Sequence, residues 1–337
     1  MKTKMSIPQR IVAYVKGNPI VVMMALVSII VGFTIPNFFS LNNFNVLMGN
    51  TTIRFLIALG VSGCLITKGT DLSAGRQAAL AATLTGVMVQ RADYASRLFS
   101  WMPEMNMIVA LLIVLVIGAI IGIVTGSIIA YLKVPPVIAT LGIQTIVYGI
   151  NLIYTGAQPI GGFHQNFKDF FNWKIFAIGE FKGFSGYILI AILFGLLFWF
   201  LYNKTTHGKY MYAIGGNENA AEVAGINVTK SKIKIYMLAG LLYGLTGFLV
   251  CAKSGGCSVN TGMGWELEAI AGCTIGGVSV NGGVGKITGI LIGVLVFEVL
   301  KIVLQFLGVE SSYTYIAQGL VIIIAVALDL RKYLAKK

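Results

Sequence analysis

Apolar segments long enough to cross a lipid bilayer restrict the fold of this chain more than any other feature. Seven are clear, at residues 19–39, 107–132, 137–154, 186–202, 235–252, 287–306 and 313–329. A bilayer core of about 30 Å needs about 20 apolar residues in a helix. Three more, at residues 54–67, 77–90 and 266–278, are shorter, with about fourteen residues each. The pattern predicts an all-α polytopic membrane protein with about ten transmembrane segments, some short or broken.

Composition supports this fold class. The chain is 57% hydrophobic and only 11% charged, whereas soluble domains contain roughly 25% charged residues. Too few polar side chains are present to cover a water-soluble globule. The first apolar run continues from Pro19 without a small-residue cleavage pattern, which favours an uncleaved first helix over a signal peptide. We expect residues 1–337 to form a single membrane domain.

The net charge of +13 is concentrated in three places. These are the N-terminal segment, residues 203–234 and the C-terminal tail: Lys2, Lys4, Arg10 and Lys16; Lys204, Lys209, Lys230, Lys232 and Lys234; Arg331, Lys332, Lys336 and Lys337. Cytoplasmic loops of membrane proteins carry such an excess of Lys and Arg. Both termini and residues 203–234 are therefore predicted to be cytoplasmic, and ten crossings place residues 203–234 on the same side as the termini. This placement argues against a nucleic-acid partner.

Residues for catalysis or metal binding are scarce. The four cysteines form no CxxC pair, which favours free, buried thiols, and two histidines are too few for a histidine-rich metal site. Gly282–Ile287 reads GGVGKI, but a phosphate-binding loop needs Ser or Thr after the lysine to hold magnesium. We therefore expect no catalytic residues, no metal site and no cofactor in this chain.

The short segments mark two breaks in the helices. Lys68–Arg76 reads KGTDLSAGR and Ser279–Lys286 reads SVNGGVGK, each after a Gly-Cys pair. Short, glycine-interrupted segments at matching positions indicate a transport path, although coincidence among 41 glycines is the alternative. Asp71 either caps the following helix or lines the path. The candidates for the path or gate are Asp71, Ser73, Gly75, Ser279, Asn281 and Gly283.

Glycines four residues apart and in-membrane charges predict helix contacts. Gly118, Gly122 and Gly126 form a ladder, and Gly240 with Gly244 and Gly289 with Gly293 form pairs. Such spacing lets helix backbones approach closely, within one chain or between two. Glu298 and Lys301 are three residues apart, so they share a helix face and predict a structural ion pair. Residues 91–106 and 155–186 are expected on the outer side, as a cover, a partner surface or plain loops.

A short helix is predicted inside residues 203–234. In the run from Asn217 to Gly225, either asparagine can cap a helix that spans about Glu218 to Ala224, and Asn219 with Glu222 fits a capping box. Gly225 suits the left-handed residue that ends a helix. The small residues Ala220, Ala221 and Ala224 are expected to be exposed. Such a helix fits a groove on a partner protein, and a simple capped loop is the alternative.

These residues resemble a known family. The run GGNENAAEVAGINV looks like the coupling loop of permease subunits of bacterial ABC sugar importers, the ribose, xylose and galactose group. Thr67–Ala82 and Ala269–Gly289 carry further resemblance, which extends along the whole chain. Thr70–Gln77 is most similar to the galactose/methyl-galactoside permeases of that group, while Lys68 departs from the pattern.

The resemblance implies a function and a set of partners. It implies a homodimeric permease in the bacterial inner membrane that translocates a monosaccharide, most similar to those for galactose or methyl galactoside, into the cytoplasm. An ABC ATP-binding subunit, which holds ATP and magnesium, would receive a coupling helix of Asn217, Glu218, Asn219, Ala220, Ala221, Glu222, Ala224 and Gly225. A periplasmic sugar-binding protein would dock on the outer face. The alternatives are a permease for another sugar or small solute, and a stand-alone secondary carrier.

Overall fold

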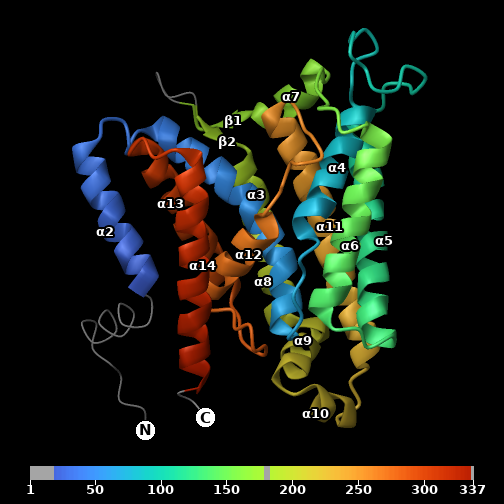
Figure 1. Ribbon diagram of the computed structural model, residues 1–337, viewed down its shortest axis with the longest axis vertical. Helices are drawn as coiled ribbons and strands as arrows, with labels where there is room; N and C mark the ends of the chain where they lie inside the picture. The colour runs from blue at the N-terminus through green and yellow to red at the C-terminus, as the bar shows by residue number, and fades with distance from the viewer. Residues whose placement is uncertain (1–18, 178–182, 335–337) are drawn as a thin grey trace.

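The computed structural model describes residues 19–177 and 183–334, which form an elongated bundle of helices (Figure 1). The elements are α2 (Pro19–Thr34), α3 (Leu41–Ile66), α4 (Ala74–Met88), α5 (Met107–Tyr131), α6 (Pro136–Thr155), α7 (Gln165–Asn172), β1 (Lys174–Ile175), β2 (Phe184–Ser185), α8 (Tyr187–Lys204), α9 (Thr206–Gly216), α10 (Glu218–Val223), α11 (Val228–Ser254), α12 (Trp265–Ile275), α13 (Ile287–Phe306) and α14 (Ser311–Leu334). The strands β1 and β2 form one antiparallel pair, with Lys174 opposite Ser185. The described chain is thus helical apart from this short hairpin.

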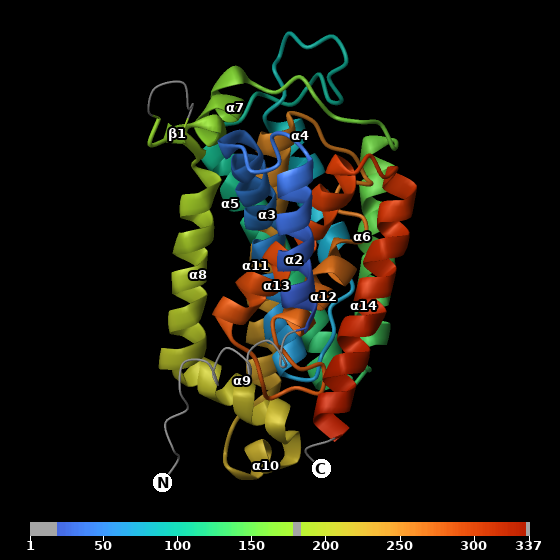
Figure 2. The same ribbon diagram turned by 90° about the vertical axis from the view of Figure 1, so that its left-hand side faces the viewer.

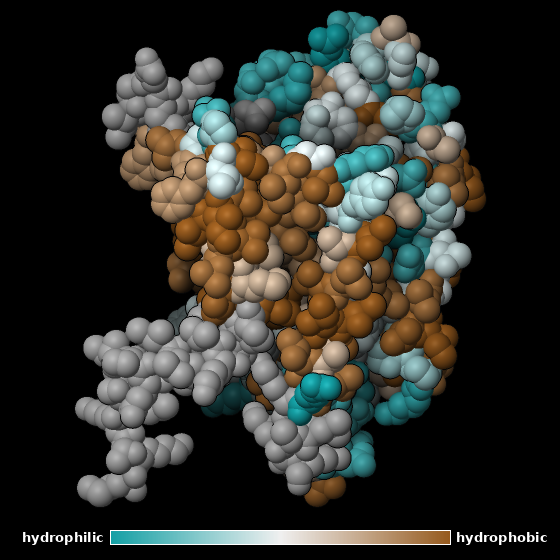
Figure 3. Space-filling model, turned by 60° about the vertical axis from the view of Figure 1, so that its left-hand side comes forward, coloured by the Kyte–Doolittle hydropathy of each residue, from teal (hydrophilic) through white to brown (hydrophobic). Residues whose placement is uncertain are grey.

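Seven of the described helices are long and apolar enough to cross a membrane: α3, α5, α6, α8, α11, α13 and the part of α14 up to Arg331. The shorter apolar helix α2 precedes them. All four cysteines are free and buried, as predicted. Figure 3 shows a hydrophobic face along the bundle, with hydrophilic residues gathered toward its ends. The prediction of a polytopic helical membrane protein is therefore confirmed.

One segment prediction is wrong. Residues 54–67 were expected to form a short crossing of about fourteen residues, but they are the C-terminal part of α3, which has 26 residues and begins at Leu41. The polar residues Asn43, Asn45 and Asn50 in its first half lower the hydropathy there. Most of α3 is buried inside the bundle, so contacts with protein replace contacts with lipid. Hydropathy alone therefore missed half of this helix.

Two helices are short, as predicted. α4 has 15 residues and α12 has 11, and both begin near the middle of the long axis and run to opposite ends of the bundle (Figure 1). Break 1, residues 67–73, joins α3 to α4, and break 2, residues 276–286, joins α12 to α13. The core lies where α11 packs against α3, α4 and α5. Both breaks are thus positioned beside this core.

The glycine ladder of α5 packs against α11. A Cβ added at Gly118 would overlap the carbonyl oxygen of Gly240, and one added at Gly240 would overlap the carbonyl oxygen of Gly118. The same overlap occurs between Gly122 and the carbonyl oxygen of Tyr236. Because only glycine allows this approach of two backbones, the ladder is used within the chain. In α13, Gly293 likewise packs against Gly272 of α12, and Gly289 packs against Gly276, which follows α12.

The two ends of the bundle differ. The "α10 end" holds α9 and α10, and the opposite "α7 end" holds α7, the strands and residues 91–106 (Figures 1 and 2). At the α7 end, Gln90 donates a hydrogen bond of 2.9 Å to the carbonyl of Gly161, and Phe167 of α7 stacks edge-on against Phe248 of α11 at 5.3 Å. Residues 155–186, as far as they are described, are thus folded onto the bundle, which is more than a plain loop.

Candidate coupling helix and helix breaks

The short helix α10 forms within one residue of its predicted bounds, with well-defined caps. Asn217 has extended backbone angles and its Oδ1 accepts a hydrogen bond of 3.1 Å from the backbone N–H of Ala220. At the other end Gly225 has φ +84° and Ile226 donates its N–H to the carbonyl of Ala221 at 3.1 Å. This is a Schellman motif. Asn217 is the cap, so the prediction of an Asn219–Glu222 capping box is wrong.

The exposed face of α10 differs in part from the expected one. Ala220 and Ala224 are exposed, as predicted. Ala221 is not exposed: it is buried against Ile214 of α9 and Val228 of α11, because it lies on the face of α10 that turns toward the bundle. The most exposed apolar residue nearby is Val223, at 90% exposure. Sequence reasoning overlooked Val223, although an apolar residue beside the predicted alanines was the available signal.

Caps and an ion pair hold α10 in place. Glu218 at its first turn pairs with Lys232 of α11, with the lysine Nζ 2.7 Å from Oε1. The Thr205 hydroxyl caps α9 by accepting from the Gly208 N–H, and Asn227 caps α11. In α9, burial lowers the pKa of His207, and nearby Lys234 lowers it further. The segment 203–234 is therefore a folded unit of α9, α10 and the start of α11.

Break 1 is closed by Asp71, which is 1% exposed. Its Oδ1 accepts hydrogen bonds from the backbone N–H of Ser73 at 2.9 Å and from the Ser73 hydroxyl at 2.5 Å. Its Oδ2 accepts from the Tyr243 hydroxyl of α11 at 3.1 Å. Both carboxylate oxygens are thus bonded inside the chain, just before α4 begins at Ala74. Asp71 therefore closes the turn before α4 through Ser73. The N-cap position of α4 is held by Ser73 and not by Asp71, so the alternative in which Asp71 caps this helix is wrong.

The starts of α4 and α12 meet at Gly75. A Cβ added there would overlap the carboxylate of Glu266 and the carbonyl oxygen of Gly262. Next to it, Arg76 donates to the carbonyl of Val259 at 2.9 Å. The N-terminus of a helix carries partial positive charge, and here two such ends face one buried carboxylate. No local pattern pairs Glu266 with Gly75, because the two residues lie far apart in the chain.

Break 2 holds the other three path candidates. The Ser279 hydroxyl lies 3.2 Å from Oδ2 of Asp329 in α14 and accepts from the N–H of Asn281 at 3.2 Å. Gly283 donates its N–H to the carbonyl of Ile66, at the end of α3, at 2.8 Å. The two sets of path candidates therefore do not form one cluster. Asp71, Ser73 and Gly75 lie beside the start of α12, whereas Ser279, Asn281 and Gly283 lie at the α10 end.

The two Gly-Cys motifs end their helices in the same way. Gly69 donates its N–H to the carbonyl of Cys64 at 2.8 Å, and Val278 donates to Cys273 at 2.9 Å. Between each pair lies one left-handed residue, Lys68 with φ +59° in the first motif and glycine in the second. The two motifs thus match in backbone geometry as well as in sequence. Lys68 is unusual because its left-handed backbone conformation is one that favours glycine.

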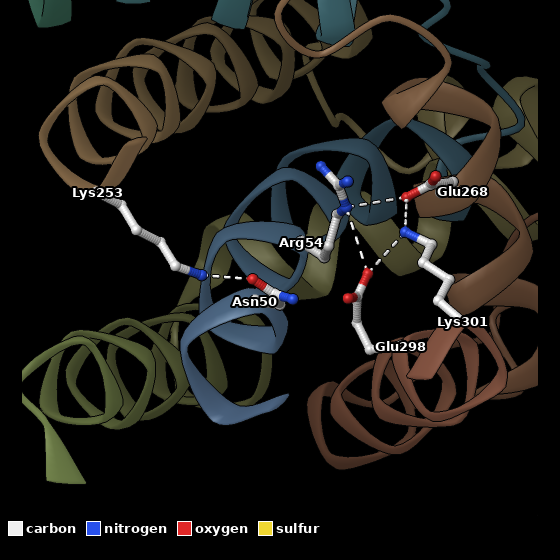
Figure 4. A network of polar contacts seen from close by, with 6 residues as sticks. All are labelled: Asn50, Arg54, Lys253, Glu268, Glu298 and Lys301. Atoms are coloured by element: carbon white, nitrogen blue, oxygen red, sulfur yellow. Dashed lines mark hydrogen bonds and ion pairs between the residues drawn. The ribbon is translucent and has the colours of Figure 1, made fainter. Parts of the chain in front are cut away.

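A cluster of charges joins α12 to α3 and α13 (Figure 4). Lys301 lies 2.8 Å from Glu298, which confirms the predicted ion pair, and 2.7 Å from Glu268 of α12. Arg54 of α3 lies 2.9 Å from Glu268 and 3.3 Å from Glu298, and its guanidinium stacks 3.7 Å above the Trp265 ring. The ion-paired residues are two acids and two bases, and Lys253 of α11, which contacts Asn50, adds a further cation to the network. Pairing of this kind offsets part of the cost of burying charges.

Several helices long enough to span a membrane, two helix breaks inside the bundle and a folded unit at one end define a polytopic membrane protein of the permease type. The chain belongs to the family described as "Branched-chain amino acid transport system / permease component", whose model matches residues 43–326.

Similar proteins agree with this class. The chain is 44% identical to the galactose/methyl galactoside import permease protein MglC of Escherichia coli K12, over 96% of each chain. It is also 44% identical to MglC of Haemophilus influenzae, over 94% of each. It is 36% identical to the ribose import permease protein RbsC of E. coli K12, over 93% of each. No solved structure matches. The prediction of a transport subunit rather than an enzyme is thus supported.

Proposed function

We propose that this chain is the permease subunit of an ATP-driven importer that carries galactose or methyl galactoside across the bacterial inner membrane into the cytoplasm. The observation that carries the proposal is 44% identity to a galactose/methyl galactoside import permease over 96% of the chain. α10 adds independent support, since a capped helix with an exposed tip at one end of the bundle suits a groove on a partner.

The proposed partners follow from the two ends. An ATP-binding subunit, which holds ATP and magnesium, docks on α10, and a periplasmic sugar-binding protein docks on the α7 end. A second copy of the chain completes the membrane part. The lysines of residues 203–234 favour a cytoplasmic α10 end. The N-terminal basic residues and the last two lysines lie outside the described residues, so the cytoplasmic location of both termini rests on charge alone.

The two breaks are the proposed path or gate. Unwound backbone at membrane depth must be buried in protein or face a water-filled cavity, and Asp71, Ser73, Gly75, Ser279, Asn281 and Gly283 lie in or beside such backbone. Single cysteines at Ser73 and Asn281 should react with a polar maleimide in one nucleotide state more than in another. Protection of both positions in every state would contradict the path assignment.

Uptake measurements test the cargo. In a strain that lacks this chain and its paralogues, expression of the chain with its ATP-binding and sugar-binding partners should restore uptake of labelled galactose and methyl galactoside over ribose and xylose. Preference for ribose or xylose would assign a different sugar. Uptake by the chain alone in liposomes without an ATP-binding subunit would instead identify a secondary carrier.

The docking role of α10 is tested at its exposed tip. Val223→Arg should reduce copurification of the ATP-binding subunit and sugar uptake, because a long charged side chain at a 90% exposed position disturbs the partner contact without disturbing the core. Leu132→Arg is the matched control, since Leu132 is 71% exposed and ends α5 at the same end of the bundle. Equal behaviour of the two variants would contradict docking through α10.

A further inference from the structure

The ends of α3 and α9 meet the loop of break 2 at one junction, formed by Ile66, Lys68, Gly215, Gly216, Gly282 and Gly283. A Cβ added at Gly215 would overlap the carbonyl oxygen of Ile66 and lie 2.5 Å from the N–H nitrogen of Gly283. The Ile66 carbonyl is bonded to that same N–H at 2.8 Å. Three backbones are therefore in direct contact, with no side chain between α9 and break 2.

The exposed side chain of Lys68 contacts this junction. Its Nζ lies 3.4 Å from the carbonyl oxygen of Gly216, the last residue of α9. A cation is favoured there because the C-terminus of a helix carries partial negative charge. The lysine stem packs against Gly282, where an added Cβ would overlap the Lys68 Cγ. The left-handed backbone of Lys68 costs about 1–2 kcal/mol in a residue with a Cβ, a cost that glycine at this position would avoid.

The junction adjoins α10 directly. Gly216 is followed by Asn217, the residue that caps α10. On the side of the junction away from α10, Lys68 lies in break 1, which leads to α4, and Gly283 lies in break 2, which leads to α13. The Tyr212 hydroxyl of α9 adds a second bond to break 2, at 2.9 Å to the carbonyl of Gly285. A displacement of α9 and α10 is thus applied to both breaks at a single point.

We propose that Lys68 is a positioning residue that keeps the last turn of α9 and the two breaks moving as one unit, so that work received at α10 reaches both breaks together. This inference rests on the proposed function. It assigns a role to the lysine that departs from its family pattern. The contact is permanent through the transport cycle, and the opening occurs elsewhere in the breaks.

The first test separates coupling from folding. In proteoliposomes with the complete transporter, Lys68→Met should lower galactose uptake per ATP hydrolysed by about five- to tenfold, which is the lower end of the usual range of coupling between sites. ATP hydrolysis should persist, because docking at α10 is intact, and Lys68→Arg should restore coupling. Lys133→Met is the matched control, since Lys133 follows α5 in the same left-handed conformation, with φ +55°.

An unchanged uptake-to-hydrolysis ratio in Lys68→Met would overturn the proposal, as would an equal loss in Lys133→Met. A wild-type transporter that hydrolyses ATP without importing sugar would instead refute the proposed function, so the two failures are distinguishable.

A second test replaces the contact between Lys68 and Gly216 with a covalent one. Lys68→Cys combined with Gly216→Cys permits cross-linking with a short bismaleimide, and Gly216 has open space around its Cβ position. If the junction moves as one unit, the cross-linked transporter should keep most of its uptake. If cross-linking abolishes uptake while ATP hydrolysis continues, the contact must open during transport and the proposal fails.

Discussion

Two helix contacts inside the bundle are held together in different ways. Between α5 and α11, glycine backbones touch and no charged side chain takes part in the contact at Gly118, Gly122 and Gly240. Between α3, α12 and α13, four charged side chains form ion pairs, and Lys253 of α11 lies beside them (Figure 4). Burying charges costs several kcal/mol per ion before pairing offsets it, so the second solution needs a reason.

The reason is the length of the helices. α5 and α11 have 25 and 27 residues, and their close approach runs from Val114 beside Gly244 to Gly126 beside Ile233, which gives ample contact area without polar groups. α12 has only 11 residues, so its glycine contact with α13, at Gly272 and Gly293, is shorter. Directional ion pairs from Arg54 and Lys301 to Glu268 add to that contact. Polar contacts thus supplement backbone packing where the helix is short.

The largest effect is expected where backbones touch. Gly240→Leu should prevent α5 and α11 from packing, because even a Cβ overlaps the carbonyl of Gly118 and neither backbone can move aside. Overpacking of a core side chain costs about 1–3 kcal/mol, and a backbone overlap should exceed this. Folded protein recovered from the membrane in mild detergent should fall to near zero.

Gly142→Ala is the control for that substitution. Gly142 lies in α6, also a spanning helix, and has nothing within 4 Å of its Cβ position. The alanine should be neutral or stabilising by up to about 1 kcal/mol, the difference in helix propensity. If both variants lose folded protein to the same extent, close backbone approach does not explain the α5–α11 contact.

A somewhat smaller effect is expected in the charged cluster. Arg54→Met leaves Glu268 and Glu298 paired with Lys301, with Lys253 more distant, and breaking a buried ion pair by removing one partner costs up to about 3–5 kcal/mol. The thermal unfolding midpoint in detergent should drop clearly, and uptake should fall because α12 loses its anchor on α3. A midpoint close to wild type would mean that the cluster is hydrated and contributes little.

The smallest effect is expected when charge balance is restored. Arg54→Met with Glu268→Gln leaves the neutral pair of Glu298 and Lys301, so stability should recover to within about 1–2 kcal/mol of wild type. Uptake should stay low, because the ion pair that fixes α12 to α3 is still absent. Full recovery of both stability and uptake would show that charge balance, and not the position of α12, is what the cluster provides.

How much the sequence predicted can be judged from particular residues. Hydropathy located the spanning helices, and asparagine and glycine signals placed α10 within one residue of its observed bounds, since capping is a local interaction. The ion pair of Glu298 and Lys301 followed from helical spacing. The extension of that pair to Arg54 and Glu268, residues more than 200 positions apart in the chain, did not, because it depends on how α3, α12 and α13 pack.

The sequence by itself determined the membrane-spanning class, the two breaks and the short helix between α9 and α11. These features depend on the length of apolar runs, on glycines and on capping residues, which all act on neighbouring residues in the chain. Only the tertiary structure decided which face of α10 is exposed and that the glycine ladder of α5 packs within one chain. It also decided that both breaks lie beside the end of α9, near Lys68, and that the two sets of path candidates stay apart. Those outcomes depend on contacts between distant segments, whose backbones fit together at glycines that no local pattern pairs.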